Sequence, residues 1–181
     1  GVFRYDYGRN DFIFDRRLNG ILYNDLTVTG LTVDRSNNLY VGTNEGVARW
    51  NISEREGKRY TMIDGLAGVR ISSLYTDSKG QVWIGSSQDV GLTRYDPVED
   101  EFTIIELGYK LAPRCIAETS DGTIWLGTEY GVIGLRGDTV SYHLTENDGL
   151  LSNIINLLQP DKKGNLYIGS NNGLNRFNTA E

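Results

Sequence analysis

Short apolar runs alternate with polar turns along the chain, and four of these runs align with one another. They begin at Asn38, Gln81, Thr123 and Asn165, and each contains three consecutive apolar or aromatic side chains, as in residues 82–84. A strand covered on one side alternates apolar and polar residues, so consecutive apolar residues predict short strands buried on both faces. No segment keeps an apolar period of 3.6 residues, so the pattern predicts no helix.

The alignment defines an internal repeat. Its anchor is a glycine that recurs at intervals of 43, 42 and 42 residues, at Gly42, Gly85, Gly127 and Gly169. A large aromatic side chain lies two positions before each anchor, at Tyr40, Trp83, Trp125 and Tyr167. An aromatic side chain at a constant place in a central strand is expected to pack between repeats, and the glycine lets a neighbouring backbone approach closely. Arginines that recur in register are expected to be structural too, at Arg49, Arg94 and Arg176.

Each repeat divides into four short strands. In the second repeat we expect strands at residues 69–76, 81–86, 92–95 and 101–107, with a turn from Asp77 to Gly80. Asp-x-x-Gly clusters supply the positive φ angles that tight hairpins need, and the aspartate caps the turn through its side chain. Four strands per unit and a period of roughly 40 to 50 residues predict an all-β fold, a β-propeller made of four-stranded antiparallel blades.

We expect one partial β-propeller domain over residues 1–181. The repeat pattern assigns the end of a preceding blade to residues 1–17, three blades to residues 26–64, 69–107 and 113–145, and an incomplete blade to residues 154–178. This is about four and a half blades, and propellers usually have four to eight. The chain is therefore interpreted as part of a larger propeller.

Composition narrows the function classes. Of the 181 residues, 39% are hydrophobic and 23% are charged, as in an ordinary globular domain. The formal net charge of −6 argues against nucleic acid and against an anionic membrane surface as partners, because both attract basic proteins. No apolar run approaches the roughly 18 residues of a membrane span, so no membrane contact is expected for this segment.

Few residues suit catalysis or metal binding. His143 is the only histidine, which excludes a zinc site built from several histidines, and its place in an expected outer strand favours a structural role. Cys115 is flanked by Ile116 and Ala117, so we interpret it as a buried apolar residue and not as a nucleophile. We therefore expect no catalytic residue, no metal and no cofactor.

Loop residues that differ between repeats are better candidates for binding, because loops on a rigid scaffold carry function. In propellers the turn between the second and third strands lies on the same face as the connection into the first strand. The turns contain Asn44, Glu45, Gln88, Asp89, Glu129, Tyr130, Asn171 and Asn172, and the connections contain Arg70, Arg114 and Asn153. Arginine, asparagine and an aromatic ring together suit a polyhydroxyl or carboxylated sugar.

Two segments carry a longer motif: Asp-Gly-Leu, a strand, Asp-x-x-Gly, aromatic-x-Gly-Ser and Gly-Leu-x-Arg-aromatic. It runs from Asp64 to Tyr95 and again from Asp148 to Phe177. The motif resembles the two-component regulator propeller repeat, and the resemblance covers nearly the whole chain. The third repeat departs from it, since residues 107–109 replace Asp-Gly-Leu and Thr119 replaces the turn aspartate.

The resemblance implies a piece of an extracytoplasmic sensor. In that family such repeats build periplasmic sensor regions ahead of a membrane helix and a histidine kinase, and many members look like sensors of glycan fragments. For this chain the resemblance implies a periplasmic, non-catalytic segment of a membrane-anchored protein, with an oligosaccharide as its ligand. The expected partners are other propeller segments of the same protein or a second copy.

Two alternatives stay open. One is a protein–protein interaction propeller without a small-molecule ligand. The other is an enzyme similar to streptogramin lyases, which rely on a histidine, an acidic cluster and a metal. A chain with one histidine matches that second pattern poorly.

Overall fold

Five antiparallel sheets make up the computed structural model, which describes residues 3–22, 27–87, 91–108 and 111–179. The first is a hairpin of β1 (Phe3–Asp6) and β2 (Asp11–Phe14). The second contains β3 (Val28–Val33), β4 (Asn38–Thr43), β5 (Gly46–Asn51) and β6 (Glu56–Tyr60). The third contains β7 (Ile71–Thr76), β8 (Val82–Ser86), β9 (Gly91–Asp96) and β10 (Glu101–Ile105). The fourth contains β11 (Cys115–Glu118), β12 (Ile124–Gly127), β13 (Val132–Arg136) and β14 (Thr139–Leu144), and the fifth β15 (Ile155–Pro160), β16 (Asn165–Ser170) and β17 (Gly173–Asn178).

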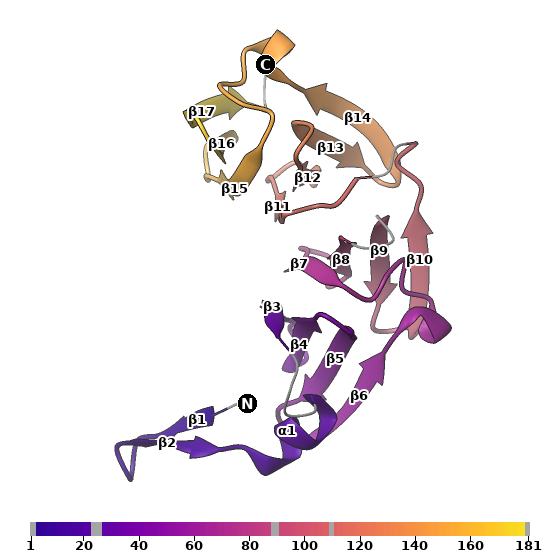
Figure 1. Ribbon diagram of the computed structural model, residues 1–181, viewed down its shortest axis with the longest axis vertical. Coiled ribbons are helices and arrows are strands. Elements are labelled where there is room, and N and C mark those ends of the chain that lie inside the picture. The colour runs from indigo at the N-terminus through magenta and orange to yellow at the C-terminus, as the bar shows by residue number, and fades with distance from the viewer. Residues whose placement is uncertain (1–2, 23–26, 88–90, 109–110, 180–181) are drawn as a thin grey trace.

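The four larger sheets follow one another along an open arc, each with its first strand on the inside (Figure 1). β3, β7, β11 and β15 lie side by side along the inner edge, and β6, β10 and β14 lie on the outside. This is β-propeller architecture, so the predicted fold is confirmed; the described sheets form an arc and not a closed ring. The strands of the second repeat lie within the predicted ranges or one residue beyond them.

One α-helix departs from the all-β prediction, besides two single-turn 3-10 helices, η1 (Met62–Asp64) and η2 (Glu146–Asp148). Helix α1 (Arg16–Leu22) follows the hairpin, and Asp15 caps it by accepting hydrogen bonds from the amides of Arg17 and Leu18, both at 3.1 Å. Leu18 and Leu22 pack against Trp50. The prediction of no helix is therefore wrong here. Seven residues with two leucines on the buried face are too few to produce a recognisable helical period in the sequence.

The repeated aromatic residues form the core between blades. Tyr40, Trp83 and Trp125 have exposed fractions of 1%, 3% and 0%, and each packs against the sheet that follows. Their predicted place in the core is confirmed. Tyr167, in the last sheet, is half-buried. The aromatic position of the repeat is thus buried where another sheet packs against it.

Two of the recurring arginines bridge neighbouring blades, as predicted. Arg49 on β5 donates to the Tyr95 hydroxyl on β9 of the next blade at 3.1 Å. Arg94 on β9 forms an ion pair with Asp138, which lies just before β14 of the next blade. Burial raises the pKa of the Tyr95 hydroxyl, so it stays protonated and available as a hydrogen-bonding group.

The Asp-x-x-Gly turns are held by their aspartates. Asp77 Oδ1 accepts from the amides of Lys79 and Gln81, both at 2.9 Å, and Oδ2 accepts from Trp83 Nε1 at 2.8 Å. One carboxylate therefore fixes the hairpin and also orients the core indole. This confirms the predicted capping role.

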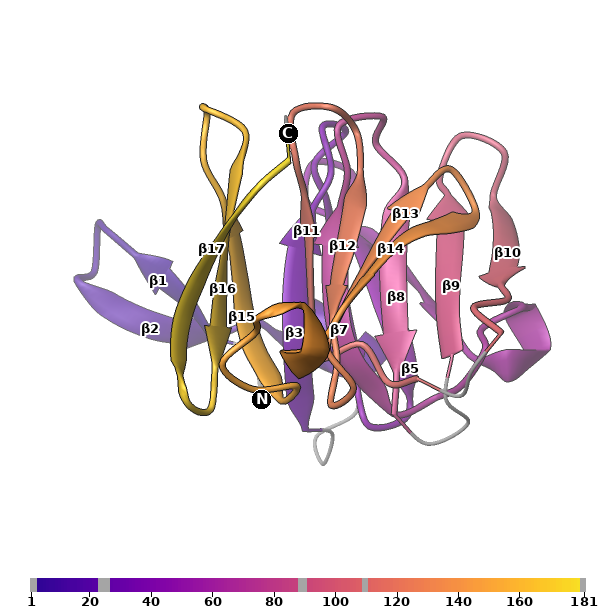
Figure 2. The ribbon, with the colours of Figure 1, turned by 90° about the horizontal axis from the view of Figure 1, so that it is seen from above.

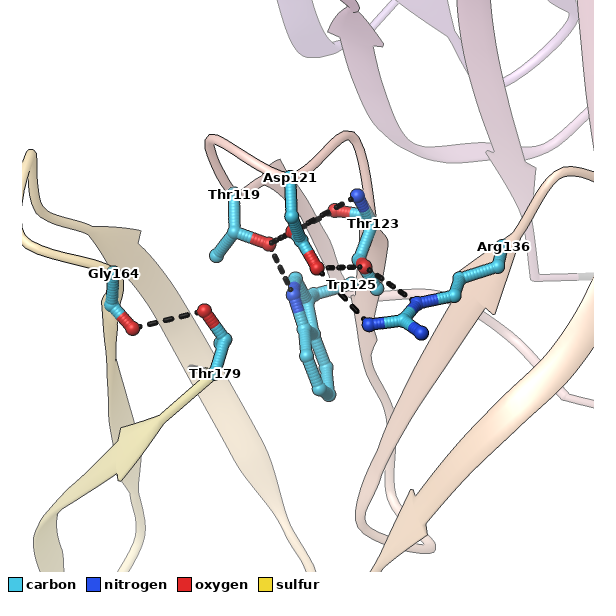
Figure 3. A network of polar contacts seen from close by, with 7 residues as sticks. All are labelled: Thr119, Asp121, Thr123, Trp125, Arg136, Gly164 and Thr179. Atoms are coloured by element: carbon cyan, nitrogen blue, oxygen red, sulfur yellow. Dashed lines mark hydrogen bonds and ion pairs between the residues drawn. The ribbon is translucent and has the colours of Figure 1, made fainter. Parts of the chain in front are cut away.

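The third full blade reaches the same result with different residues (Figure 3). Thr119, at the position of Asp77, accepts from Trp125 Nε1 at 2.9 Å and donates to Asp121 Oδ1 at 2.6 Å. Asp121 in turn accepts from the Thr123 amide at 3.2 Å and pairs with Arg136 at 3.3 Å. In this blade the carboxylate lies two residues further along the chain, and the Thr119 hydroxyl connects it to the indole by hydrogen bonds.

Candidate ligand-binding site

The turns between second and third strands share one edge with the connections into the first strands. Three backbone hydrogen bonds join the two sets: Ser87 N to Arg70 O at 2.8 Å, Gly131 N to Asn153 O at 2.8 Å, and Asn171 N to Ile154 O at 3.1 Å. Figure 2 shows the strands side-on, with the turns gathered at the two ends of each sheet. We call this edge the rim. The prediction that these turns and connections lie on one face is confirmed.

At the rim end of each of the inner strands β3, β7, β11 and β15, one residue is not paired with the neighbouring strand. The pairing of β3, β7 and β15 with the next strand skips Thr29, Ser72 and Asn156, each a β-bulge. In the remaining blade Arg114 directly precedes Cys115, the first paired residue of β11, and therefore holds the equivalent position. A bulge redirects its side chain away from the sheet, and such positions recur next to functional sites.

Arg114 is the centre of a polar cluster that joins two blades. Its Nη1 lies 2.9 Å from Glu129 Oε1, and its Nη2 donates to Asn156 Oδ1 at 3.3 Å. Asn156 Nδ2 then donates to Asn171 Oδ1 at 2.9 Å. The side chains of Arg114 and Glu129 are 41% and 61% exposed, so the cluster is open to solvent. We refer to these four residues as the Arg114 cluster.

Three of the residues singled out from the sequence thus come together: Arg114, Glu129 and Asn171. Asn156 was missed. The signal for it was present, because Asn156 follows Arg114 by 42 residues and so occupies the same position one repeat later. What the sequence did not reveal is the bulge that turns this position toward the rim.

The other candidates lie on the rim outside the Arg114 cluster. Asn44 accepts from the amide of Thr27 at 3.0 Å, which ties a turn to the connection into β3. Arg70 is exposed, and Tyr130, beside Glu129, is 63% exposed. Gln88 and Asp89 lie outside the described residues.

The two residues most often used in catalysis are engaged structurally. His143 Nε2 lies 3.0 Å from the carbonyl oxygen of Tyr130. Burial raises the pKa of the Cys115 thiol to about 11, so it is a thiol and not a nucleophilic thiolate near neutral pH. The described part of the chain contains no group of three or more His, Cys, Asp or Glu residues placed to hold a metal ion. Within the same residues, no helix is long and apolar enough to cross a membrane.

A family model described as the two component regulator propeller matches three segments, residues 65–88, 111–130 and 149–172. These three segments of the chain are two-component regulator propeller repeats. The second matched segment includes Thr119, which stands in place of the turn aspartate. The matched segments also include Arg114, Glu129, Asn156 and Asn171, the whole Arg114 cluster.

Solved structures share the fold. The extracellular domain of a protein assigned as a hybrid two component system of B. thetaiotaomicron aligns with a TM-score of 0.79 at 24% identity, over 97% of this chain and 24% of that chain. A second such domain from the same organism aligns with a TM-score of 0.73 at 24% identity, over 87% of this chain and 22% of that chain. The chain thus spans about a quarter of the length of these structures.

A virginiamycin B lyase from Staphylococcus aureus also aligns, with a TM-score of 0.70 at 16% identity, over 86% of this chain and 56% of that chain. At that identity the likeness extends to the propeller fold alone. A search of curated proteins finds no match to the chain.

Proposed function

We propose that this chain is a non-catalytic, ligand-sensing segment of an extracytoplasmic two-component sensor, and that its ligand is an oligosaccharide or glycan fragment. Three segments of the chain match the two-component regulator propeller repeat, and extracellular domains assigned to hybrid two component systems share its fold. In this proposal the full-length protein is membrane-anchored, with this segment on the periplasmic side.

The observation that carries the proposal is the Arg114 cluster on the rim. A charged donor, a carboxylate and two amides are held in one hydrogen-bonded chain, yet the two charged side chains stay 41% and 61% exposed. Prearranged donors and acceptors bind polar ligands with little loss of side-chain freedom. Sugar hydroxyls, which both donate and accept, match such a set.

Isothermal titration calorimetry with a panel of neutral and acidic oligosaccharides tests the proposal. We expect binding by the wild-type chain and at least a roughly tenfold loss of affinity in Arg114→Ala, because a hydrogen bond to a charged group contributes about 1.5–3 kcal/mol. Arg136→Ala is the matched control, since Arg136 is also an exposed, ion-paired arginine of the same blade but lies at the opposite end of its strands.

Binding that survives Arg114→Ala unchanged would place the ligand elsewhere. If no oligosaccharide binds the wild-type chain and a protein partner is recovered by pull-down, the chain is a protein-interaction propeller instead. A lyase would show itself by turnover of a streptogramin that is lost in His143→Ala.

We also propose that another propeller segment, of the same protein or of a second copy, packs against the last sheet. Leu157 and Leu174 both pair with Gly169, so they share a face, and they are 69% and 66% exposed. In the second sheet the equivalent glycine, Gly42, faces Ile71 of the following blade, where an added Cβ would come within 2.7 Å of its side chain. Exposed apolar faces of this kind mark interaction sites.

A further inference from the structure

The charge state of the Arg114 cluster bears on which sugars it admits, an inference that rests on the proposed function. Arg114 is not an uncompensated cation, because Glu129 Oε1 lies 2.9 Å from its Nη1. Its Nη2 is also occupied, by Asn156 Oδ1 at 3.3 Å. The cluster is therefore electrically balanced before any ligand arrives.

A carboxylated ligand meets a competitor at this site. To pair with Arg114 it must displace Glu129 or lie beside it, and two carboxylates on one guanidinium repel each other. The formal net charge of −6 on the chain adds an unfavourable long-range field for any anion. An acidic sugar therefore loses part of what it would gain from the arginine.

A neutral hydroxyl group meets no such conflict. The remaining N–H groups of Arg114 can donate to it, and the second carboxylate oxygen of Glu129 can accept from it. Asn156 and Asn171 extend the set of amide donors and acceptors toward the next blade. We infer that Glu129 is a specificity-determining residue that tunes the site to neutral polyhydroxyl ligands and against sugars that carry carboxylates.

Matched pairs of ligands test this inference. The probes are oligogalacturonates and the same oligomers after complete methyl esterification, with xylo-oligosaccharides without and with glucuronic acid as a second pair. For the wild-type chain we expect the neutral member of a pair to bind at least about tenfold more tightly in calorimetry. In Glu129→Gln, which keeps the shape and one acceptor oxygen, that preference should fall below about threefold or reverse.

Glu45→Gln is the matched control. Glu45 is also a rim glutamate paired with an arginine, at 2.9 Å from Arg59, and the side chains of Glu45 and Glu129 are 59% and 61% exposed. The control should leave the preference unchanged. Equal or tighter wild-type binding of the acidic member overturns the inference and leaves the proposed function standing, as does a preference that Glu129→Gln does not alter. If the wild-type chain binds neither member of either pair and no other oligosaccharide of the panel, the proposed function falls and the inference falls with it.

Discussion

Trp83→Ala tests the packing between blades most directly. The Trp83 side chain is 3% exposed and lies in a cluster with residues of the following sheet, among them Leu126 and Ile133. Truncation of a buried tryptophan costs about 3–5 kcal/mol through lost contacts and the cavity left behind. The carboxylate of Asp77, which is 7% exposed, also loses the indole donor at 2.8 Å.

A second variant shows how much of that cost an aromatic ring recovers. Trp83→Phe keeps a phenyl ring in the core but removes the N–H together with the pyrrole part of the indole, so it should cost less than Trp83→Ala but at least about 1 kcal/mol, because the buried carboxylate of Asp77 is left without its partner. Urea unfolding followed by far-UV circular dichroism measures both losses, because that signal does not depend on the tryptophan itself.

Tyr167→Ala is the matched control, since Tyr167 holds the same repeat position in the last sheet and is only half-buried. It should cost less than about 2 kcal/mol. A loss below about 1 kcal/mol for Trp83→Ala, or equal losses for the two alanine variants, would refute the assignment of the aromatic position to the core between blades.

Three further predictions concern single polar groups. Thr119→Val should destabilise the chain by about 1–3 kcal/mol in urea unfolding, because the buried Nε1 of Trp125 loses its acceptor at 2.9 Å; an unchanged midpoint would contradict this. The hydrogen bond from Tyr95 lowers the pKa of Asp100. The contribution of the Asp100 carboxylate to folding stability is therefore present above the unfolded-state pKa of about 3.9 and is lost as pH falls through the folded-state pKa. Asp100→Asn removes this carboxylate and should therefore reduce the loss of stability at acid pH, by less than about 1 kcal/mol because the Asp100 side chain is half exposed. An equal loss of stability at acid pH in the wild-type chain and in Asp100→Asn would contradict the prediction. Cys115 is half-buried and burial raises its pKa to about 11, so it should react with Ellman's reagent at pH 8 more slowly before unfolding than after it, and equal rates would contradict this.

Much of the fold could be predicted from the sequence because each repeat encodes it locally. Consecutive apolar residues, Asp-x-x-Gly turns and the spacing of the anchor glycines specify where strands begin and turn, and the observed strands of the second repeat follow them. Helix α1 escaped prediction because its two buried leucines face a neighbouring tryptophan that only the fold brings near. Thr119 holds the repeat position of Asp77 and has no carboxylate, yet Asp121 supplies one that is hydrogen-bonded to the Thr119 hydroxyl.

The candidate site was predicted in part. Position in the repeat was enough to place Arg114, Glu129 and Asn171 on the rim. Their connection depends on Asn156, whose side chain leaves the sheet at a bulge, and a bulge is a property of how two strands pair. Sequence reasoning chose Asn153 in that connection instead, and its backbone carbonyl accepts from the amide of Gly131.

By itself, the sequence determined the repeat, the blade architecture and the kinds of residue available on the rim, because strand periodicity and turn chemistry act over a few neighbouring positions. Only the tertiary structure decided which rim residues meet. Arg114 and Asn156 lie 42 residues apart, and their contact exists because two blades pack with their inner strands side by side. The same packing decided that Trp125 is wholly buried while Tyr167, its equivalent one repeat later, is not, since burial depends on the neighbour that a blade receives.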